Sequence, residues 1–274
     1  ASYAIVGQTG SIAIAYKRTG DTFASLGALT GMTGGYAAKE VVCTPDGVYW
    51  AIGTADPASG NRIHFYKRTG DTFTKLAYPA FVALAVSAMA FDPTGVYLFA
   101  GGATNSHSRI WGYKRTGDTF AALTTPDPGV GYVEPLSLTW SYDSTYVAGA
   151  GAAYGAGAGH TVYVYKRSGD IFTRIFSEGS ATSGGYALAF SPDINATYLA
   201  MAMLANSPNT LVIYKRDGDT FTKLTSIVYT SPTVTAQNPT NLVWSSDSSI
   251  LYVTSAASPY LVPFLRDGDT FTQI

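Results

Sequence analysis

The sequence predicts an all-β fold: a six-bladed β-propeller built from tandem copies of one four-stranded antiparallel unit. Two recurring segments support this prediction. The first reads YKRTGDTF in three copies, and its versions begin at Tyr16, Tyr66, Tyr113, Tyr165, Tyr214 and Phe264, at intervals of 47–52 residues. The second lies between these copies and joins an apolar run, a turn and another apolar run, as in MAFDPTGVYLFAG from Met89. A period of this length with four short strands is typical of a propeller blade.

Each unit is interpreted as strand a, a turn, strand b, a loop, strand c, a tight turn and strand d. The apolar runs are short and rich in Val, Ile, Tyr, Phe and Thr, which favours strands over helices. We expect one domain over residues 1–274, because a propeller of this length is commonly a single domain. The units cover approximately 1–26, 36–76, 85–123, 135–175, 185–224 and 240–274.

The first unit is incomplete. If strands b are aligned on their first tyrosine, from Tyr49 to Tyr252, then Tyr3 begins strand b of the first unit and its innermost strand a is missing. A blade without that strand leaves an unpaired edge. Three explanations stay open: a longer polypeptide, a strand donated by a neighbouring chain, or a three-stranded first blade. A seven-bladed propeller with missing material is the alternative to six blades.

The YKRTGDTF segment predicts a tight hairpin between strands c and d. A two-residue loop with glycine second, as in Thr19-Gly20, suits a type I′ turn. In that register the arginine of each copy faces the aspartate across the strands, and the tyrosine faces the phenylalanine on the same side. We interpret these pairs as structural, serving mainly to set the register. The predicted ion pairs are Arg18–Asp21, Arg68–Asp71, Arg115–Asp118, Arg167–Asp170, Arg216–Asp219 and Arg266–Asp269.

The lysine before each arginine is the residue of the motif that packing explains least. Lys17 and its equivalents up to Lys215 face threonine in the predicted register, and Leu265 breaks the series. A functional alternative is a ring of basic sites for phosphates or acidic glycans.

Two resemblances follow from these segments. The turn Phe190-Ser191-Pro192-Asp193, followed by the strand YLAMA, resembles WD40 and related propellers. Strand c ends in Tyr-Lys-Arg rather than Trp-Asp, and no Gly-His pair precedes the blades, so the WD40 signature itself is absent. The repeated hairpin is similar to propeller domains of bacteriophage structural proteins, which implies a virion or extracellular location.

We expect function on the face where the d–a and b–c connections open. These connections are long and differ between units, whereas the a–b and c–d turns are short and repetitive. Exposed tyrosine beside Gly, Ser and Asn is typical of recognition surfaces. Tyr36 and Tyr186 follow Gly-Gly just before strand a, which places them near the mouth of the central channel. The candidate residues are Tyr36, Tyr78, Phe81, His107, Tyr132, Tyr154, His160, Tyr186 and Tyr229.

Composition argues against several other classes of function. A net charge of −1 shows no footprint for nucleic acid or an anionic membrane, and no apolar run reaches the roughly 18 residues of a transmembrane helix. The single cysteine, Cys43, aligns with aromatic residues at the end of strand a. We therefore expect it in a buried core position, with looser packing in that blade and no role as a nucleophile.

The sequence shows no set of residues for catalysis, a metal or a cofactor. His107 and His160 lie in adjacent b–c loops, but further metal ligands are not evident. Glu40 and Glu134 are the carboxylates expected nearest the channel, and they do not form an evident pair.

The sequence therefore predicts a non-enzymatic binding or structural propeller. We expect it in a virion or extracellular assembly, where it engages a protein partner or host surface through the variable face. The alternative is a multivalent carbohydrate-binding lectin with pockets between blades, and a hydrolase is a third hypothesis. No cofactor, nucleic acid or membrane insertion is expected, and a neighbouring chain could donate the missing strand.

Overall fold

The computed structural model describes residues 2–8, 12–32, 37–54, 63–77, 85–104, 107–124, 133–153, 160–180, 183–205, 211–225, 227–228, 239–255 and 260–274. The chain divides into two compact units, Ala1–Thr125 and Pro126–Ile274. The single domain expected over residues 1–274 stays a prediction. In the described ranges no helix is long and apolar enough to cross a membrane.

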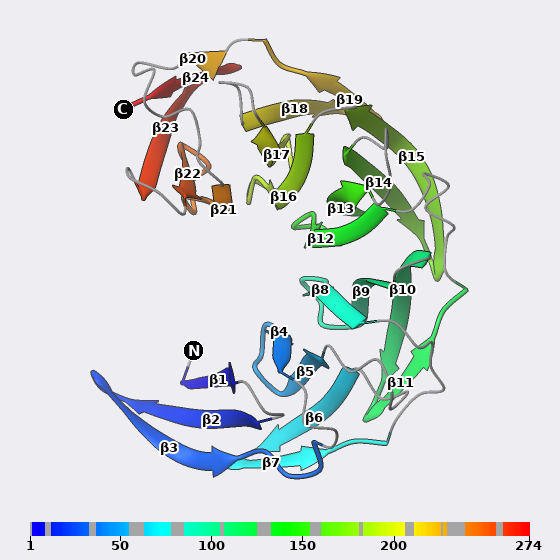
Figure 1. Cartoon of the computed structure of the whole chain (residues 1–274), viewed down its shortest axis with the longest axis vertical. Helices are drawn as coiled ribbons and strands as arrows, with labels where there is room; N and C mark the ends of the chain where they lie inside the picture. Colours follow the sequence, from blue (N-terminus) through cyan, green and yellow to red (C-terminus); the bar gives the residue numbers. More distant parts are fainter. Residues whose placement is uncertain are drawn as a thin grey trace. The chain divides into compact units, whose positions relative to one another are not determined.

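The first unit contains three antiparallel sheets, with strand orders β1-β2-β3, β4-β5-β6-β7 and β8-β9-β10-β11. Figure 1 shows β4 and β8 along one side of this unit and β7 and β11 along the other. The bounds of its strands are β1 (Tyr3–Gln8), β2 (Ile12–Thr19), β3 (Thr22–Ala28), β4 (Ala38–Cys43), β5 (Tyr49–Thr54), β6 (Ile63–Thr69), β7 (Thr72–Lys75), β8 (Ala85–Phe91), β9 (Tyr97–Thr104), β10 (His107–Thr116) and β11 (Thr119–Ala122).

The second unit contains three more antiparallel sheets, β12 to β15, β16 to β19 and β21 to β24. A short strand, β20, pairs in parallel with β24 and makes the last sheet five-stranded. The bounds of its strands are β12 (Val133–Trp140), β13 (Tyr146–Ala153), β14 (His160–Ser168), β15 (Ile171–Ser180), β16 (Ser183–Phe190), β17 (Tyr198–Ala205), β18 (Leu211–Asp217), β19 (Thr220–Lys223), β20 (Ile227–Val228), β21 (Pro239–Trp244), β22 (Ile250–Ser255), β23 (Leu261–Asp267) and β24 (Thr270–Gln273).

The predicted fold class is confirmed: six antiparallel sheets, one for each repeat, with strands a to d in sequence order. The first sheet has three strands, and β1 is its strand b, as the alignment of Tyr3 with Tyr49 predicts. The parallel strand β20 is not predicted. The last strand b starts at Ile250 rather than near Tyr252, because Ile250 pairs with Leu265 as Tyr198 pairs with Lys215.

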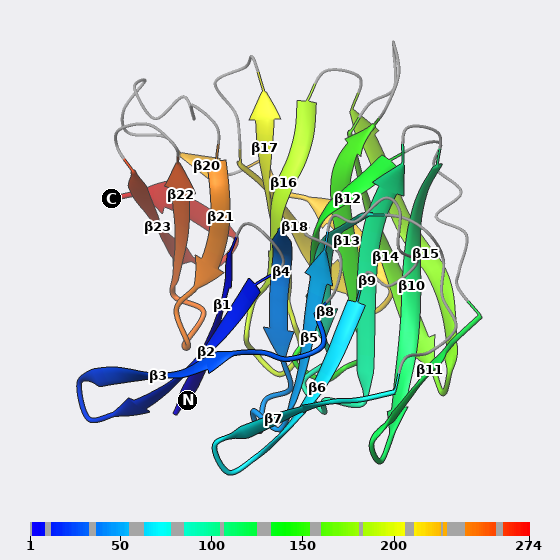
Figure 2. The same cartoon turned by 60° about the horizontal axis from the view of Figure 1, so that its bottom comes forward.

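The predicted register of the c–d hairpin is wrong by one residue. Thr19 pairs with Thr22, so Gly20 and Asp21 form the loop and glycine is first, which suits a type II′ turn. Gly20 has φ 61°. The predicted loop would have placed the β-branched Thr19 at positive φ, which is sterically costly. Figure 2 shows the hairpin tips of the first unit at one end of their sheets.

The corrected register changes the partners across the hairpin. Arg18 pairs with Phe23 rather than Asp21, and Lys17 pairs with Ala24 rather than Thr22. Tyr16 pairs with Ser25 rather than Phe23, next to a β-bulge. The same shift applies to the other hairpins, as in Arg115, which pairs with Phe120.

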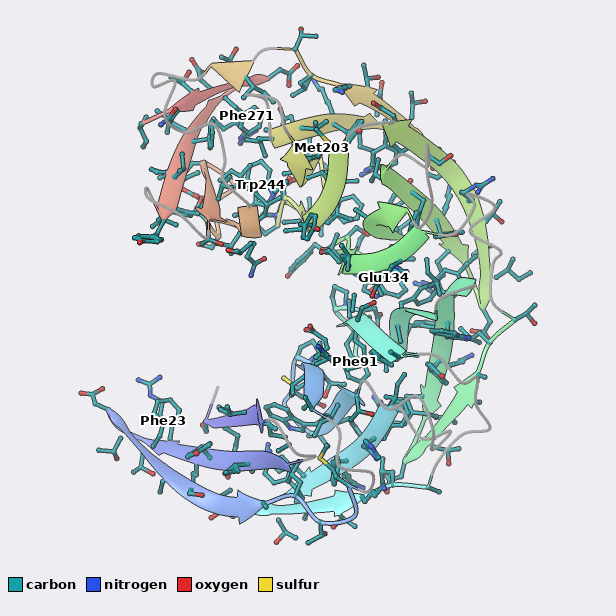
Figure 3. All side chains as sticks on the ribbon, in the orientation of Figure 1. Phe23, Phe91, Glu134, Met203, Trp244 and Phe271 are labelled. Atoms are coloured by element: carbon teal, nitrogen blue, oxygen red, sulfur yellow. The ribbon has the colours of Figure 1, made fainter. Side chains whose placement is uncertain are left out.

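Apolar side chains between neighbouring sheets form the core. In the first unit, Phe65 of the second sheet stacks on Phe120 of the third with ring centroids 4.0 Å apart. Phe120 is 2% exposed, and in the second unit Phe271 is fully buried. The equivalent Phe23 of the first sheet is 59% exposed. Figure 3 labels Phe23 on β3 and Phe271 on β24.

Cys43 is exposed, so its predicted burial is wrong. In other sheets this position carries an aromatic ring that packs on the phenylalanine of strand d, as Trp140 does on Phe172. In the second sheet the ring comes instead from Trp50, which lies opposite Cys43 and contacts Phe73 at 5.9 Å. In this sheet strand b rather than strand a supplies the aromatic residue, and the ring contact with the phenylalanine of strand d is kept.

Replacing Phe120 with alanine should destabilise the protein by about 3–5 kcal/mol, because the substitution empties a buried position between two sheets. The matched substitution Phe23→Ala should change the stability by less than about 0.5 kcal/mol, because that ring is largely exposed. Urea midpoints of both variants measure the difference. Equal losses of stability in the two variants would contradict the burial of Phe120 and the exposure of Phe23.

Candidate interaction surface

Within both units, a hairpin aspartate joins a sheet to the one before it. Asp118, at the β10–β11 turn, accepts a hydrogen bond from Tyr49 Oη at 2.6 Å and one from Lys67 Nζ at 2.8 Å. The guanidinium of Arg115 lies over the Tyr49 ring, 4.2 Å from its centroid. Tyr49 and Lys67 belong to the second sheet, whereas Arg115 and Asp118 belong to the third. We call this four-residue contact the inter-sheet clasp.

The clasp recurs in both units. Its members elsewhere are Tyr3, Lys17, Arg68 and Asp71; Tyr146, Lys166, Arg216 and Asp219; and Tyr198, Lys215, Arg266 and Asp269. The lysine–aspartate distances in these three are 2.6–2.8 Å. Four of the lysines that packing did not explain, Lys17, Lys67, Lys166 and Lys215, thus bind the aspartate of the next sheet. In the last sheet Ile250 and Leu265 occupy the positions of the tyrosine and the lysine.

For Asp71, Asp118, Asp219 and Asp269, a contact with the preceding sheet stands in place of the predicted pair with the arginine of the same hairpin. In the first hairpin, Arg18 Nη2 does lie 3.9 Å from Asp21, at the limit of an ion pair. In complete sheets the arginine instead donates through Nε to the carbonyl of its own a–b turn, as Arg115 does to Gly95 at 2.9 Å. Arg18, whose sheet lacks that turn, donates to the carbonyl of Gly20.

The clasp shifts the pKa values of its members. Hydrogen bonds from Lys67 and then Tyr49 lower the pKa of Asp118, and the bond to Asp118 raises the pKa of Lys67. Burial, followed by the bond to Asp219, raises the pKa of Tyr146 to about 12. The aspartate and lysine therefore stay charged, and the tyrosine stays a hydrogen-bond donor, across the neutral range.

Strand a of every complete sheet carries a β-bulge that the sequence did not predict. In β16 the register shifts between Gly185 and Ala187, so Tyr186 is the extra residue, and it is 38% exposed. A bulge redirects one side chain and is common beside functional sites. The extra residues in the other strands a are Lys39, Ser87, Leu136 and Thr240. We call these five residues the bulge row.

The bulge row varies in chemistry while the backbone feature repeats. Lys39 and Thr240 are exposed, and Ser87 and Leu136 are partly buried. Thr240 Oγ1 lies 2.8 Å from Thr254 Oγ1 of the neighbouring strand. Five equivalent positions thus carry a cation, two hydroxyls, an aliphatic chain and an aromatic ring.

Most of the predicted recognition residues lie outside the part of the chain that the structure describes. Tyr186 is described and lies in the bulge row. His107 and His160 begin β10 and β14, but their side chains lie outside the described part of the chain. The predicted residues that lie entirely outside the described ranges are Tyr36, Tyr78, Phe81, Tyr132, Tyr154 and Tyr229.

The described residues offer few groups for chemistry. None of them gather as three or more histidine, cysteine, aspartate or glutamate side chains around a metal position. Burial raises the pKa of Glu40, on β4, and Glu134 lies on β12 of the other unit. His64 is buried within β6.

No family model and no curated protein matches this chain. Solved structures do match. Sqt1 of Saccharomyces cerevisiae has a TM-score of 0.72 at 12% identity and covers 100% of this chain and 72% of its own. The Cps50 (Swd1) β-propeller domain of Myceliophteria thermophila has a TM-score of 0.66 at 10% identity, over 100% of this chain and 83% of its own.

A third similar structure is a Bacteroides fragilis protein provisionally named a 6-phosphogluconolactonase. Its TM-score is 0.67 at 17% identity, over 99% of this chain and 79% of its own. Identities this low show the fold alone. The chain has the fold of a six-bladed β-propeller, and its resemblance to WD40 propellers is confirmed at that level. The resemblance to bacteriophage proteins stays a prediction.

Stability should fall with pH in the acid range, because the clasp aspartates have lowered pKa values in the folded state. The unfolded chain then binds more protons around the ordinary aspartate pKa of about 3.9. The stabilisation is present above that value and is lost as the pH falls through the folded pKa. Asp118→Asn should remove part of this dependence, which urea midpoints between about pH 2 and pH 6 measure. Asp21→Asn is the control, and a flattened curve in that variant would contradict the clasp.

Proposed function

We propose that this chain is a non-enzymatic propeller that binds a protein partner through the bulge-row residues of the second unit, Leu136, Tyr186 and Thr240. The observation that carries the proposal is the repeated bulge, which presents a different side chain in each complete sheet. The protein partner was expected at the loop-bearing face. Strand a begins at that face, so the bulge row extends the expected surface along strand a.

The different side chains at the bulge positions favour a protein as the binding partner over a small ligand that binds once per blade. A lectin with one pocket per pair of blades needs equivalent residues at equivalent positions, because each pocket binds the same sugar. In the second unit the bulge row instead contains Leu136, Tyr186 and Thr240 at equivalent positions. Such diversity suits one asymmetric partner, in which each residue contacts a different group.

The structurally similar chains include a member of a protein assembly and proteins named as enzymes, so their similarity does not decide between a binding and a catalytic role. One similar chain comes from a mitotic checkpoint complex, a protein assembly, and two carry the lactonase name. The inter-sheet clasp favours a structural role for the lysines and aspartates of the repeated hairpins, because these residues bind each other across neighbouring sheets. We further propose the virion or extracellular location that the sequence predicts.

Substitutions in the bulge row should abolish partner binding. The immobilised chain should retain a protein from a lysate of its source organism, and Tyr186→Ala with Thr240→Ala should reduce that retention at least tenfold. The reason is that a few residues, tyrosine prominent among them, contribute most of the free energy of binding at protein interfaces. Quantitative mass spectrometry of the retained proteins measures the change.

A matched control substitutes exposed residues elsewhere in the sheets. Tyr142→Ala with Ile194→Ala changes two exposed apolar residues of a–b turns, at the opposite end of the sheets. This variant should retain the partner as the unchanged chain does. Equal loss in both variants would indicate non-specific adhesion and would overturn the assignment to the bulge row.

The enzymatic alternative has a direct test. The purified chain should hydrolyse 6-phosphogluconolactone no faster than buffer does, because the described residues do not assemble a carboxylate pair or a metal site. A pH-stat assay follows acid release. Turnover above the buffer rate that scales with protein concentration would contradict the non-enzymatic proposal.

A further inference from the structure

A hollow of about 360 Å³ lies in the second unit, beside the fifth sheet, β16 to β19. Its walls come from β17, from the start of β18 and from the segment that follows β19. Small-molecule pockets have volumes of roughly 300–1,000 Å³, so this hollow has room for a ligand of modest size. The apolar residues that line it are Met203, Leu211, Val212, Leu224 and Ile227.

The path of the chain after β19 explains why a hollow lies here. In the fourth sheet, β12 to β15, the outer strand β15 stays paired with β14 as far as Ser180. In the fifth sheet, Leu224 N donates to Ile213 O at 2.8 Å, and the chain then crosses to the last sheet, where Ile227 pairs with Phe271 of β24. Figure 1 shows β20 beside β24. The hollow lies along this crossing.

Lys223 supplies a cation to the lining of the hollow. It is the last residue of β19 and is half-exposed, and its Nζ lies 3.5 Å from Glu178 Oε1 of the fourth sheet. This ion pair is longer than the lysine–aspartate pairs of the clasps, which measure 2.6–2.8 Å. An ammonium group has three N–H donors, so Lys223 has the capacity to bind a second acceptor beside Glu178. Thr225 adds a hydroxyl to the same lining.

The equivalent lysine of the second sheet has a different setting. Lys75, the last residue of β7, donates to the backbone carbonyl of Gly31. A Cβ atom at Gly31 would lie 2.9 Å from Lys75 Cδ, so the Lys75 side chain packs closely on that backbone. Lys75 is thus held against a neighbouring segment, whereas Lys223 lies at a hollow and has a carboxylate as its partner.

We propose that this hollow binds a small amphiphile with one aliphatic chain and one carboxylate, the chemistry of a medium-chain fatty acid. The aliphatic chain lies against the apolar walls, and the carboxylate accepts a charge-assisted hydrogen bond from Lys223 Nζ. A sugar or nucleotide would leave polar groups without partners against these walls. The site is separate from the bulge row, because in Figure 1 β19 and β20 lie on the side of the second unit opposite to β16, which carries Tyr186.

Glu178 sets the affinity of the hollow for a carboxylate. Its charge partly neutralises Lys223 and repels a second carboxylate at the same ammonium group. Removal of the Glu178 charge should therefore tighten binding, whereas removal of the Lys223 charge should weaken it. Opposite effects from the two members of one ion pair distinguish a ligand site from a purely structural contact, in which both losses would act in the same direction.

The test titrates the whole chain with decanoate by isothermal titration calorimetry. The dissociation constant should lie below about 1 mM, a modest affinity for a ligand of this size. Hexanoate should bind at least about tenfold more weakly, because its shorter chain buries fewer methylene groups. Methionine methyl signals in carbon-13 NMR locate the site: the signal of Met203 should shift with decanoate, whereas those of Met32 and Met89 in the first unit should not.

Three variants test the ion pair. Lys223→Met keeps the length of the side chain and should weaken decanoate binding at least about tenfold, because the charge-assisted bond is lost. Glu178→Gln should strengthen decanoate binding by about threefold, because the competing charge is removed. Lys75→Met is the matched control: it changes the equivalent lysine of the first unit and should leave decanoate binding unchanged. Urea midpoints verify that each variant is folded.

Three outcomes would overturn the proposal. The absence of heat and of a Met203 shift at about 10 mM decanoate would show that the hollow does not bind an aliphatic carboxylate. Equal affinity in the Lys223→Met variant would show that decanoate binds without the ammonium group, as a non-specific detergent does. Tighter binding of a short peptide that ends in leucine would assign the hollow to the C-terminus of a protein. None of these results affects the bulge row, which is tested by partner retention, so the two proposals fail separately.

Discussion

The packing of one sheet on the next depends on a carboxylate that accepts hydrogen bonds from two different side chains. One oxygen of Asp118 binds the tyrosine of the preceding sheet and the other binds its lysine. An ionised carboxylate only accepts, so two donors satisfy both oxygens and the arginine remains available to cover the tyrosine ring. This contact explains why four residue types recur together: they belong to the interface between neighbours.

The clasp also separates structural positions from variable ones. Residues at the hairpin end of the sheets are nearly identical from repeat to repeat, and those of the four clasps make the same contact with the neighbouring sheet. The bulge in strand a lies outside that contact, so its side chain is free to vary while the backbone feature is retained. Lys39 and Tyr186 show how far this variation goes. We propose that this variation in the second unit serves the recognition of one protein partner.

The first sheet shows what the missing strand does in the others. Without strand a, Tyr3 has an open backbone edge, Gly47 faces a hollow and Phe23 lies exposed. Trp50 compensates on the adjoining side by supplying the aromatic contact to Phe73 that Cys43 cannot make.

The sequence by itself determined the six repeats, the order of their strands and the missing strand a, because each depends on local patterns of apolar and turn residues. Only the tertiary structure decided which residues meet. A hairpin register shifted by one residue gives every side chain a new partner, so Asp118 binds Lys67 of another sheet rather than Arg115. The bulge at Tyr186 and the exposure of Cys43 likewise depend on neighbouring strands, which no local pattern records.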